Sequence, residues 1–246
     1  MKKLMKNLLL GAAVLLLGIA NLSLAQGPNF IEPSSGASYH IAQITAVEAH
    51  LCSATAIGPQ ALLTATHCEL GTDALFIQGE DGQAVRELSV IKRIRDGNDH
   101  TIMFVSGGTF PSFSAVEFDY QFQIGENIFI IGNPATFKQL VRKGCIAGLG
   151  QGESSSIMDQ PLLEVFLDLR VGEGDSGAAV YNNIGKVIGV VTGIEVRGST
   201  EKGSEYSIPF SLHIMFTVDQ LKEAATFTLP SPYPSANTGM TSLVGK

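Results

Sequence analysis

The chain has 246 residues, with 23 acidic against 16 basic side chains and a formal net charge of −7 at pH 7. An acidic chain is not expected to bind nucleic acid or anionic lipid, so its charge argues against both partners. Hydrophobic residues make up 45% of the chain, which is ample for a core, and the length suits one domain or two small lobes that share a site.

The N-terminus has the pattern of a secretory signal peptide. Three lysines within the first six residues precede an apolar run of 13 residues from Leu8 to Ala20, and Ser23-Leu24-Ala25 is a cleavage site of small residues. The run is short for a membrane span, although an uncleaved anchor helix is the alternative. We expect residues 1–25 to be removed, which takes away three lysines and brings the net charge from −7 to −10. The product is expected to be secreted or periplasmic, with no stable membrane association.

The rest of the chain predicts a β-rich domain between two unstructured ends. Residues 26–38 are rich in Gly, Pro, Ser and Asn and predict a flexible leader, and a similar composition predicts a disordered tail over 226–246. Between them, short runs of β-branched and aromatic residues alternate with turn residues, which is typical of a sandwich or barrel. The predicted strands include residues 41–47, 61–65, 74–78, 84–94, 101–105, 127–131, 162–169, 178–181 and 186–192. One late helix is predicted over residues 211–225, where apolar residues fall at roughly helical spacing.

Two segments combine the residue types of nucleophilic catalysis. The segment from Thr64 to Cys68 places His67 after an apolar run, and the segment from Gly172 to Val180 places Ser176 in a glycine-rich turn. A serine hydroxyl is a weak nucleophile until a base takes its proton, and histidine is the usual base near neutral pH. The glycines allow a sharp turn that directs backbone N–H groups to one point, as an oxyanion requires. Together the segments predict acyl transfer by an activated serine, and peptide hydrolysis above all.

The cysteines fit an exported protein. Cys52, Cys68 and Cys145 are the three cysteines of the chain. In an oxidising compartment two of them can form a disulfide, which leaves one over. No Cys/His grouping has zinc spacing, so we expect no metal site.

The motifs resemble those of trypsin-like (chymotrypsin-fold) serine proteases of the bacterial secreted type. Cys52 to Cys68 looks like the histidine block of that family and Gly174-Asp175-Ser176-Gly177 like its nucleophile block; Gly125–Pro134 and Gly185–Gly193 are similar to its middle segment and to the strand after the nucleophile. The resemblance covers about residues 39–225. It implies an all-β domain of two six-stranded antiparallel β-barrels with a boundary near residues 110–125, an active site in the cleft between the barrels, and a C-terminal helix.

The same resemblance implies roles for single residues. His67, Asp99 and Ser176 would form a triad in the chymotrypsin order, with His67 and Asp99 on the first barrel and Ser176 on the second. Asp99 begins Asp99-His100-Thr101-Ile102-Met103-Phe104, which resembles the Asp-x-Ala-x-Leu of the family, whereas Asp96 precedes Gly97-Asn98 and is interpreted as a turn residue. The N–H groups of Gly174 and Ser176 would form the oxyanion hole. The family spacing also implies a Cys52–Cys68 disulfide with Cys145 free.

The chain departs from the family pattern in two places. Gly177 is followed by Ala178 and Ala179 where the family has a second glycine or serine and then proline, and two small residues still allow the backbone close to the site. The Ile-Val-Gly-Gly start that zymogen cleavage exposes is absent, so trypsin-style activation is not expected and the partner of Asp175 is not apparent.

A specificity pocket follows by resemblance as well. Arg170, six residues before Ser176, would lie near the base of the S1 pocket, and Thr192, Gly193 and Ile194 would form one wall. A guanidinium there would favour an acidic P1 side chain. The alternative is that Arg170 points outward and pairs with Asp168 or another surface acid.

We therefore predict a monomeric secreted serine endopeptidase that acts on protein or peptide substrates without a cofactor. One alternative is a catalytically inactive homologue that binds peptides or a host protein, although a complete triad argues against it. The other is an esterase on another fold, for which the order of the triad is poorly suited.

Overall fold

The structure is a computed structural model, and it describes residues 37–44, 49–79, 85–134, 137, 139–151, 163–199 and 204–229. The predicted signal peptide and residues 26–36 of the predicted leader lie outside the described residues, as do residues 230–246 of the predicted tail. In the part of the chain that is described, no helix has both the length and the apolar character needed to span a membrane.

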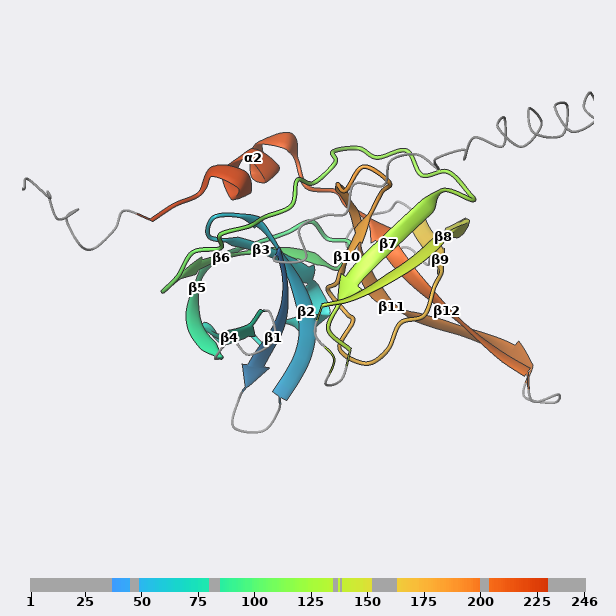
Figure 1. Cartoon of the computed structure of the whole chain (residues 1–246), viewed down its shortest axis with the longest axis horizontal. Coiled ribbons are helices and arrows are strands. Elements are labelled where there is room, and N and C mark those ends of the chain that lie inside the picture. The colour runs from blue at the N-terminus through green and yellow to red at the C-terminus, as the bar shows by residue number, and fades with distance from the viewer. Residues whose placement is uncertain are drawn as a thin grey trace, which may run out of the picture. The chain divides into compact units, whose positions relative to one another are not determined.

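Twelve strands form two closed antiparallel barrels of six strands each (Figure 1). The first barrel has the order β1-β2-β3-β6-β5-β4 and the second the order β10-β11-β12-β9-β8-β7. In the first barrel the strands are β1 (Ser38–Ile44), β2 (Ala49–Gly58), β3 (Ala61–Ala65), β4 (Ala74–Gln78), β5 (Arg86–Arg95) and β6 (His100–Ser106). In the second they are β7 (Asn127–Gly132), β8 (Leu140–Gln151), β9 (Leu163–Asp168), β10 (Ala179–Tyr181), β11 (Val187–Ser199) and β12 (Ser204–His213). This architecture confirms the double-barrel fold that the sequence predicts.

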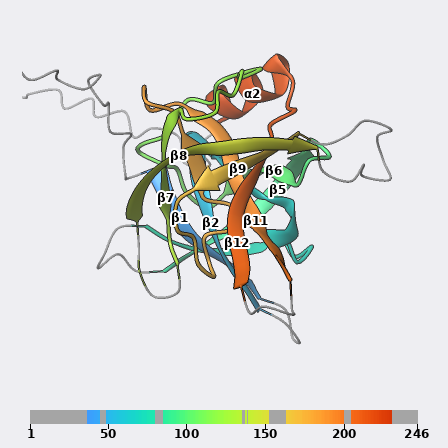
Figure 2. The same ribbon diagram turned by 90° about the vertical axis from the view of Figure 1, so that its right-hand side faces the viewer.

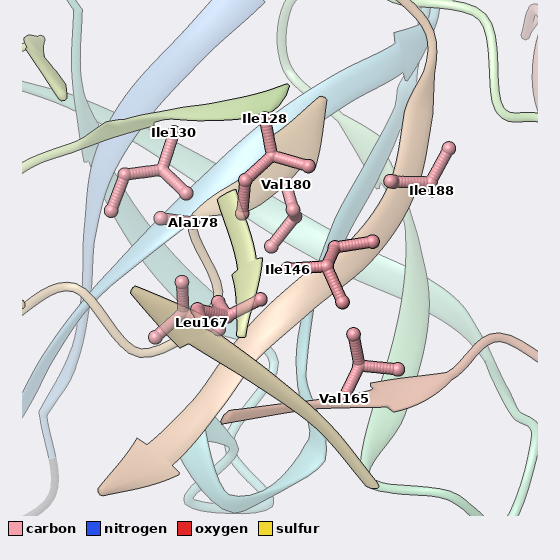
Figure 3. Close-up of a cluster of buried hydrophobic side chains, with 9 residues drawn as sticks. Ile128, Ile130, Ile146, Val165, Leu167, Ala178, Val180 and Ile188 are labelled. Carbon is pink, nitrogen blue, oxygen red and sulfur yellow. The ribbon is translucent and has the colours of Figure 1, made fainter. Parts of the chain in front are cut away.

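Each barrel is filled by alternate side chains of its strands. In the second barrel, Ile128 and Ile130 on β7 and Val165 and Leu167 on β9 point inward, with the period of two that a strand imposes (Figure 3). They pack with Ile146, Ala178, Val180, Ile188 and Val191. In the first barrel the neighbouring strands β3 and β6 are buried at all five positions and at the first six positions, respectively. Apolar burial of this kind is the main contribution to the stability of such barrels.

The connection between the barrels, residues 107–126, is bonded to both of them. The N–H of Ser114 donates to the Ala56 carbonyl on β2 at 2.9 Å, and the N–H of Val187 on β11 donates to the Ala115 carbonyl at 2.9 Å. Val116 adds an isolated parallel bridge to Val187. The connection therefore fixes the two barrels to each other.

The C-terminal helix α2 (Val218–Thr226) is shorter than predicted and starts later. Residues 211–213 of the predicted helix belong to β12, where Ser211 pairs with Val191, so the start of the prediction was wrong. Thr217 begins the helix with a capping box in which its side chain and that of Gln220 each accept a backbone N–H. Figure 2, turned by 90°, shows α2 beyond one end of the barrel strands.

Two residues from the predicted leader and tail lie within the described domain. Ser38, the last residue of the predicted leader, is the first residue of β1. Phe227, within the predicted tail, packs its ring against that of Phe104 on β6 with 4.8 Å between centroids.

Candidate active site

His67 lies in a short 3-10 helix, η2 (Thr66–Cys68), directly after β3. The N–H of Thr66 donates to the Asp99 carbonyl at 2.8 Å, which joins η2 to the start of β6. Cys68 forms the predicted disulfide with Cys52 on β2, and Cys145 is free. The histidine is thus held on both sides, while 44% of its side chain remains exposed.

Asp99 binds His67 at two points. The backbone N–H of His67 donates to Asp99 Oδ1 at 2.9 Å, and Nδ1 of the imidazole lies 2.8 Å from Asp99 Oδ2. A carboxylate in this position selects the tautomer with the proton on Nδ1, so that Nε2 is left as a base. Asp99 reaches it with a left-handed backbone conformation, φ 63°.

The loop that carries Ser176 is fastened to β2 of the first barrel. The N–H of Ser53 donates to the Ser176 carbonyl at 2.8 Å, and the Ser53 hydroxyl donates to the Gly174 carbonyl at 2.8 Å. Sγ of Cys68, the neighbour of His67 in the chain, lies 3.7 Å from the same Ser176 carbonyl oxygen. These bonds bring the serine loop beside the histidine segment, although Ser176 and His67 belong to different barrels.

Gly177 passes between the two barrels with no room for a side chain. Its φ is +85°, and a Cβ atom there would lie 2.1 Å from the Ser53 carbonyl oxygen and 2.3 Å from Thr64 Oγ1. Its N–H donates to the Val191 carbonyl on β11 at 2.9 Å. A glycine after the serine is therefore required by both conformation and space.

The partner of Asp175 is Arg142, on β8. Nη1 of Arg142 lies 2.6 Å from Asp175 Oδ2, and Nη2 donates to Oδ1, so the two side chains form a bidentate pair. Oδ2 also accepts the N–H of Gly172 at 2.7 Å. The Asp175 side chain is 1% exposed. The pair fixes the loop just before Ser176, and sequence reasoning missed it because no local pattern relates residues 33 positions apart.

The N–H groups of Gly174 and Ser176, predicted to form the oxyanion hole, donate to no backbone carbonyl of the described residues. Gly174 has φ +95°, and the N–H of Asp175 between them turns away to the Gly172 carbonyl at 3.0 Å. The oxyanion hole formed by these two N–H groups stays a prediction.

The residues predicted to form the S1 pocket make fewer contacts with one another than the residues of the predicted triad do. Thr192 and Gly193 follow one another on β11, where Thr192 donates its hydroxyl to the Val190 carbonyl and a Cβ on Gly193 would lie 3.2 Å from the ring of Phe210. Ile194 is 45% exposed. The side chain of Arg170 is exposed, and its carbonyl accepts Nη1 of Arg142 at 3.0 Å. No contact between the Arg170 guanidinium and the β11 residues is found among the described residues. In the same part of the chain, no group of three or more His, Cys, Asp or Glu is arranged to hold a metal ion.

Comparisons with known proteins bear on the family and the fold of this chain. Residues 52–190, more than half of the chain, match the profile of the trypsin-like peptidase domain. The chain is 31% identical over 108 residues to the chloroplastic Protease Do-like 1 of Arabidopsis thaliana, covering 44% of this chain and 24% of that protein. It is 24% identical over 161 residues to a probable periplasmic serine endoprotease, DegP-like, of Pseudomonas savastanoi pv. phaseolicola, covering 65% of this chain and 32% of that protein. The chain thus spans about a quarter to a third of the length of these relatives.

Among solved structures, the HtrA-type protease AlgW with tripeptide is similar, with a TM-score of 0.59 at 21% identity over 77% of this chain and 60% of that one. At this identity the likeness shows the fold alone. The matched profile includes the segments of His67, Asp99 and Ser176. With the double barrel and the sequence match taken together, the chain belongs to the trypsin-like peptidase family and has HtrA/DegP-like serine proteases among its relatives.

Proposed function

We propose that this protein is a serine endopeptidase in which Ser176 is the nucleophile, His67 the general base and Asp99 the group that orients His67. The two-point bonding of Asp99 to His67, beside the fastened loop of Ser176, is the observation that carries the proposal. A binding protein would have no need for a carboxylate aligned on one ring nitrogen of an exposed histidine. The family relationship supports the same reading.

The proposed reaction has two halves. Ser176 Oγ attacks the carbonyl carbon of the scissile peptide bond while its proton moves to Nε2 of His67, and the resulting oxyanion is bound by the N–H groups of Gly174 and Ser176. The C–N bond then breaks, and the amine leaves with the proton from His67. Water next attacks the acyl-enzyme ester, gives a proton to His67, and the carboxylic acid product leaves as Ser176 regains its hydrogen.

We also propose that the mature protein is a monomer that acts outside the cytoplasm, after cleavage behind Ala25. The Cys52–Cys68 disulfide supports this location, because disulfides persist in oxidising compartments. Several relatives are named as probable periplasmic proteases, in agreement with the proposal. The mass of the exported protein would identify its N-terminus, and size-exclusion chromatography with light scattering would give its oligomeric state.

A fluorophosphonate probe tests the nucleophile directly. We expect the probe to label wild-type protein at Ser176, and Ser176→Ala to abolish both labelling and digestion of a peptide library. Ser106→Ala is the matched control, since Ser106 lies at the end of β6 and only donates to the Ser89 carbonyl. A folded wild-type protein that neither reacts with the probe nor cleaves peptides would support the inactive homologue instead, and hydrolysis of esters without peptides would support an esterase.

For specificity we propose that Arg170 favours acidic P1 side chains. Its exposure leaves the guanidinium free to meet a substrate charge. Glutamyl, arginyl and phenylalanyl substrates should be compared for wild type and Arg170→Ala. Preference for arginyl P1, or a profile that the substitution leaves unchanged, would remove Arg170 from the pocket and favour the outward orientation.

A further inference from the structure

Besides the pair of Asp99 and His67, the structure contains a second aspartate–histidine pair, formed by Asp96 and His100. The sequence pattern predicts Asp96 to be a turn residue, and Asp96 does begin the turn that leads to Asp99. Its carboxylate, however, is buried, and both of its oxygens accept hydrogen bonds. Oδ1 accepts the N–H of Asn98 at 2.8 Å and the N–H of His100 at 3.2 Å. Oδ2 lies 2.7 Å from Nδ1 of His100 and accepts the N–H of Met215 at 2.9 Å. Both side chains of the Asp96–His100 pair are 0% exposed.

These bonds connect the Asp99 turn to the second barrel. Met215 lies just after β12, and His213 is the last residue of that strand. Asn98, which is 2% exposed, donates its side-chain N–H to the His213 carbonyl at 2.9 Å. The turn that presents Asp99 is therefore held by the end of β12 as well as by its own strand β6.

Asp99 needs such support because its backbone conformation is unfavourable. A non-glycine residue at positive φ is uncommon and persists where its surroundings determine it. Both neighbours of Asp99 are fixed by Asp96, since the N–H groups of Asn98 and His100 share Asp96 Oδ1. The Asp96–His100 pair thus determines the direction in which Asp99 leaves the turn.

Stability alone does not account for this pair. A buried pair of ionisable groups gives little or no net stability relative to apolar side chains of the same volume. Burial opposes the ionisation of Asp96, but the hydrogen bond and charge of His100 and the N–H groups of Met215 and Asn98 outweigh it and hold the Asp96 pKa below its usual value. Nε2 of His100 is buried with no hydrogen-bond partner among the described residues. The hydrogen bond of the His100 ring is therefore made through Nδ1, to Asp96.

We propose that Asp96 and His100 are positioning residues, which lock the Asp99 turn to the end of β12 so that both carboxylate oxygens of Asp99 meet His67. The inference rests on the proposed function, because it assigns the pair to the alignment of the proposed base. Neither residue touches the substrate in this scheme. Their effect is therefore expected in the turnover step and in the state of His67 rather than in substrate binding.

Two substitutions of His100 distinguish a role in positioning Asp99 from a role in filling the space that the His100 ring occupies. His100→Asn keeps an N–H donor where Nδ1 stands, whereas His100→Leu keeps the volume and removes the donor. We expect His100→Leu to lower kcat by about 100-fold, the size of effect that an ångström-scale misplacement gives, with KM unchanged. His100→Asn should keep the wild-type kcat. Should His100→Leu not fold, Asn98→Ala, which removes only the bond to the His213 carbonyl, is expected to lower kcat in the same way.

Proton NMR supplies a readout that does not depend on turnover. The proton on Nδ1 of His67, bound to Asp99, should give a far-downfield resonance in wild type and His100→Asn, and a shifted or exchange-broadened one in His100→Leu and Asn98→Ala. If wild type proves to have no peptidase activity, the proposed function fails while this resonance still tests the positioning.

Tyr181→Phe is the control for a general loss of stability. It removes the buried hydrogen bond between the hydroxyls of Tyr181 and Ser114 (3.2 Å), far from the Asp96 turn in sequence. We expect it to lower Tm and to leave kcat and the His67 resonance unchanged. Wild-type kcat and an unshifted resonance in folded His100→Leu or Asn98→Ala would overturn the proposal, as would an equal loss of kcat in Tyr181→Phe.

Discussion

Arg142 on β8 binds the buried carboxylate of Asp175 through both of its terminal nitrogens, one residue before the proposed nucleophile. The Arg142 side chain is 15% exposed and that of Asp175 1%. The position of this loop is thus set by a side chain of the folded domain, in a chain that lacks the Ile-Val-Gly-Gly start of zymogen-derived enzymes. We therefore predict that the loop reaches this arrangement without cleavage of the chain.

Replacing the Arg142 side chain should strongly destabilise the fold. Arg142→Met leaves the Asp175 charge buried without its partner, and breaking a buried pair on one side typically costs about 3–5 kcal/mol. We expect a fall of that size in the free energy of unfolding, measured by urea titration, and partial recovery when Asp175→Asn is added. Lys186→Ala is the control, because its pair with Glu117 is a surface one and should cost about 1 kcal/mol or less. Equal effects of the two substitutions would contradict a structural role for the Arg142 pair.

Gly177→Ala should prevent correct closure of the serine loop. The new methyl group would overlap the Ser53 carbonyl and the Thr64 hydroxyl in addition to straining the backbone. Gly125→Ala is a matched control with almost the same φ, +84°, and nothing within 4 Å of the new Cβ atom. We expect Gly125→Ala to cost about 1–2 kcal/mol from strain alone and to remain active, and Gly177→Ala to lose probe labelling. Labelling of Gly177→Ala at the wild-type rate would show that the loop does not need this close contact.

Asp99→Asn should lower turnover by roughly 10⁴-fold at neutral pH, because an amide donor facing Nδ1 would favour the wrong imidazole tautomer. The thermal midpoint should change little, since the Asp99 side chain is 22% exposed and the turn keeps its bonds to Asp96. Single-turnover acylation by an activated ester measures the effect on the chemical step. A loss of less than about tenfold would mean that another group orients His67.

The disulfide should contribute to stability while the third cysteine does not. Replacing both Cys52 and Cys68 by alanine is expected to cost about 2–5 kcal/mol, whereas Cys145→Ala should be nearly neutral. Peptide mapping without reductant should show Cys52 linked to Cys68 and Cys145 modified by iodoacetamide. Linkage of either partner to Cys145 would contradict the structure of the histidine segment.

The stability of the fold should decrease as the pH falls below the pKa of an unperturbed histidine. Burial lowers the pKa of His213, helped by the charge of His100 and opposed by Asp119 and Asp96. Its folded-state pKa then lies below its unfolded value of 6.5, so the unfolded chain takes up the proton first. The contribution of His213 is complete above pH 6.5 and is lost as pH falls through its folded pKa. Asp96, with a lowered pKa, adds a further loss below its unfolded value of 3.8.

Tm measured between pH 7.5 and pH 5 checks the contribution of His213. We expect the midpoint to decrease over this range in wild type and to decrease less in His213→Gln, which cannot take up the proton. Identical slopes for the two proteins would show that His213 is not the group that titrates.

The sequence predicted the barrels because most of their strands are short apolar runs with clear turn residues between them. It did not single out β8, whose glycines Gly144, Gly148 and Gly150 dilute the strand pattern. Two of these glycines are required by the neighbouring strand β9: a Cβ on Gly144 would lie 2.1 Å from the Asp168 carbonyl, and one on Gly150 2.7 Å from the Phe166 ring. Such close approaches depend on pairing with β9 and leave no local pattern.

The start of the late helix was predicted too early for a related reason. Leu212, Met215 and Phe216 have helical spacing, but the first lies in β12 and the other two in the segment before α2, where each is placed by tertiary contacts. In the candidate site, the sequence predicts catalytic roles for the groups that have recognisable local motifs, His67, Asp99 and Ser176. It did not identify Arg142, nor the burial of Asp96, because both follow from strands that meet only in the folded chain.

Ser53 on β2 is hydrogen-bonded both to the serine loop and to the segment after β7. Its N–H donates to the Ser176 carbonyl, its hydroxyl donates to Gly174, and its Oγ accepts the N–H of Asn133 at 2.9 Å. The loop cannot detach from the first barrel without releasing that one amide to solvent. The hydrogen-exchange rate of the Ser53 amide therefore reports how often the interface between the barrels opens. It can be measured at this single residue and without any substrate.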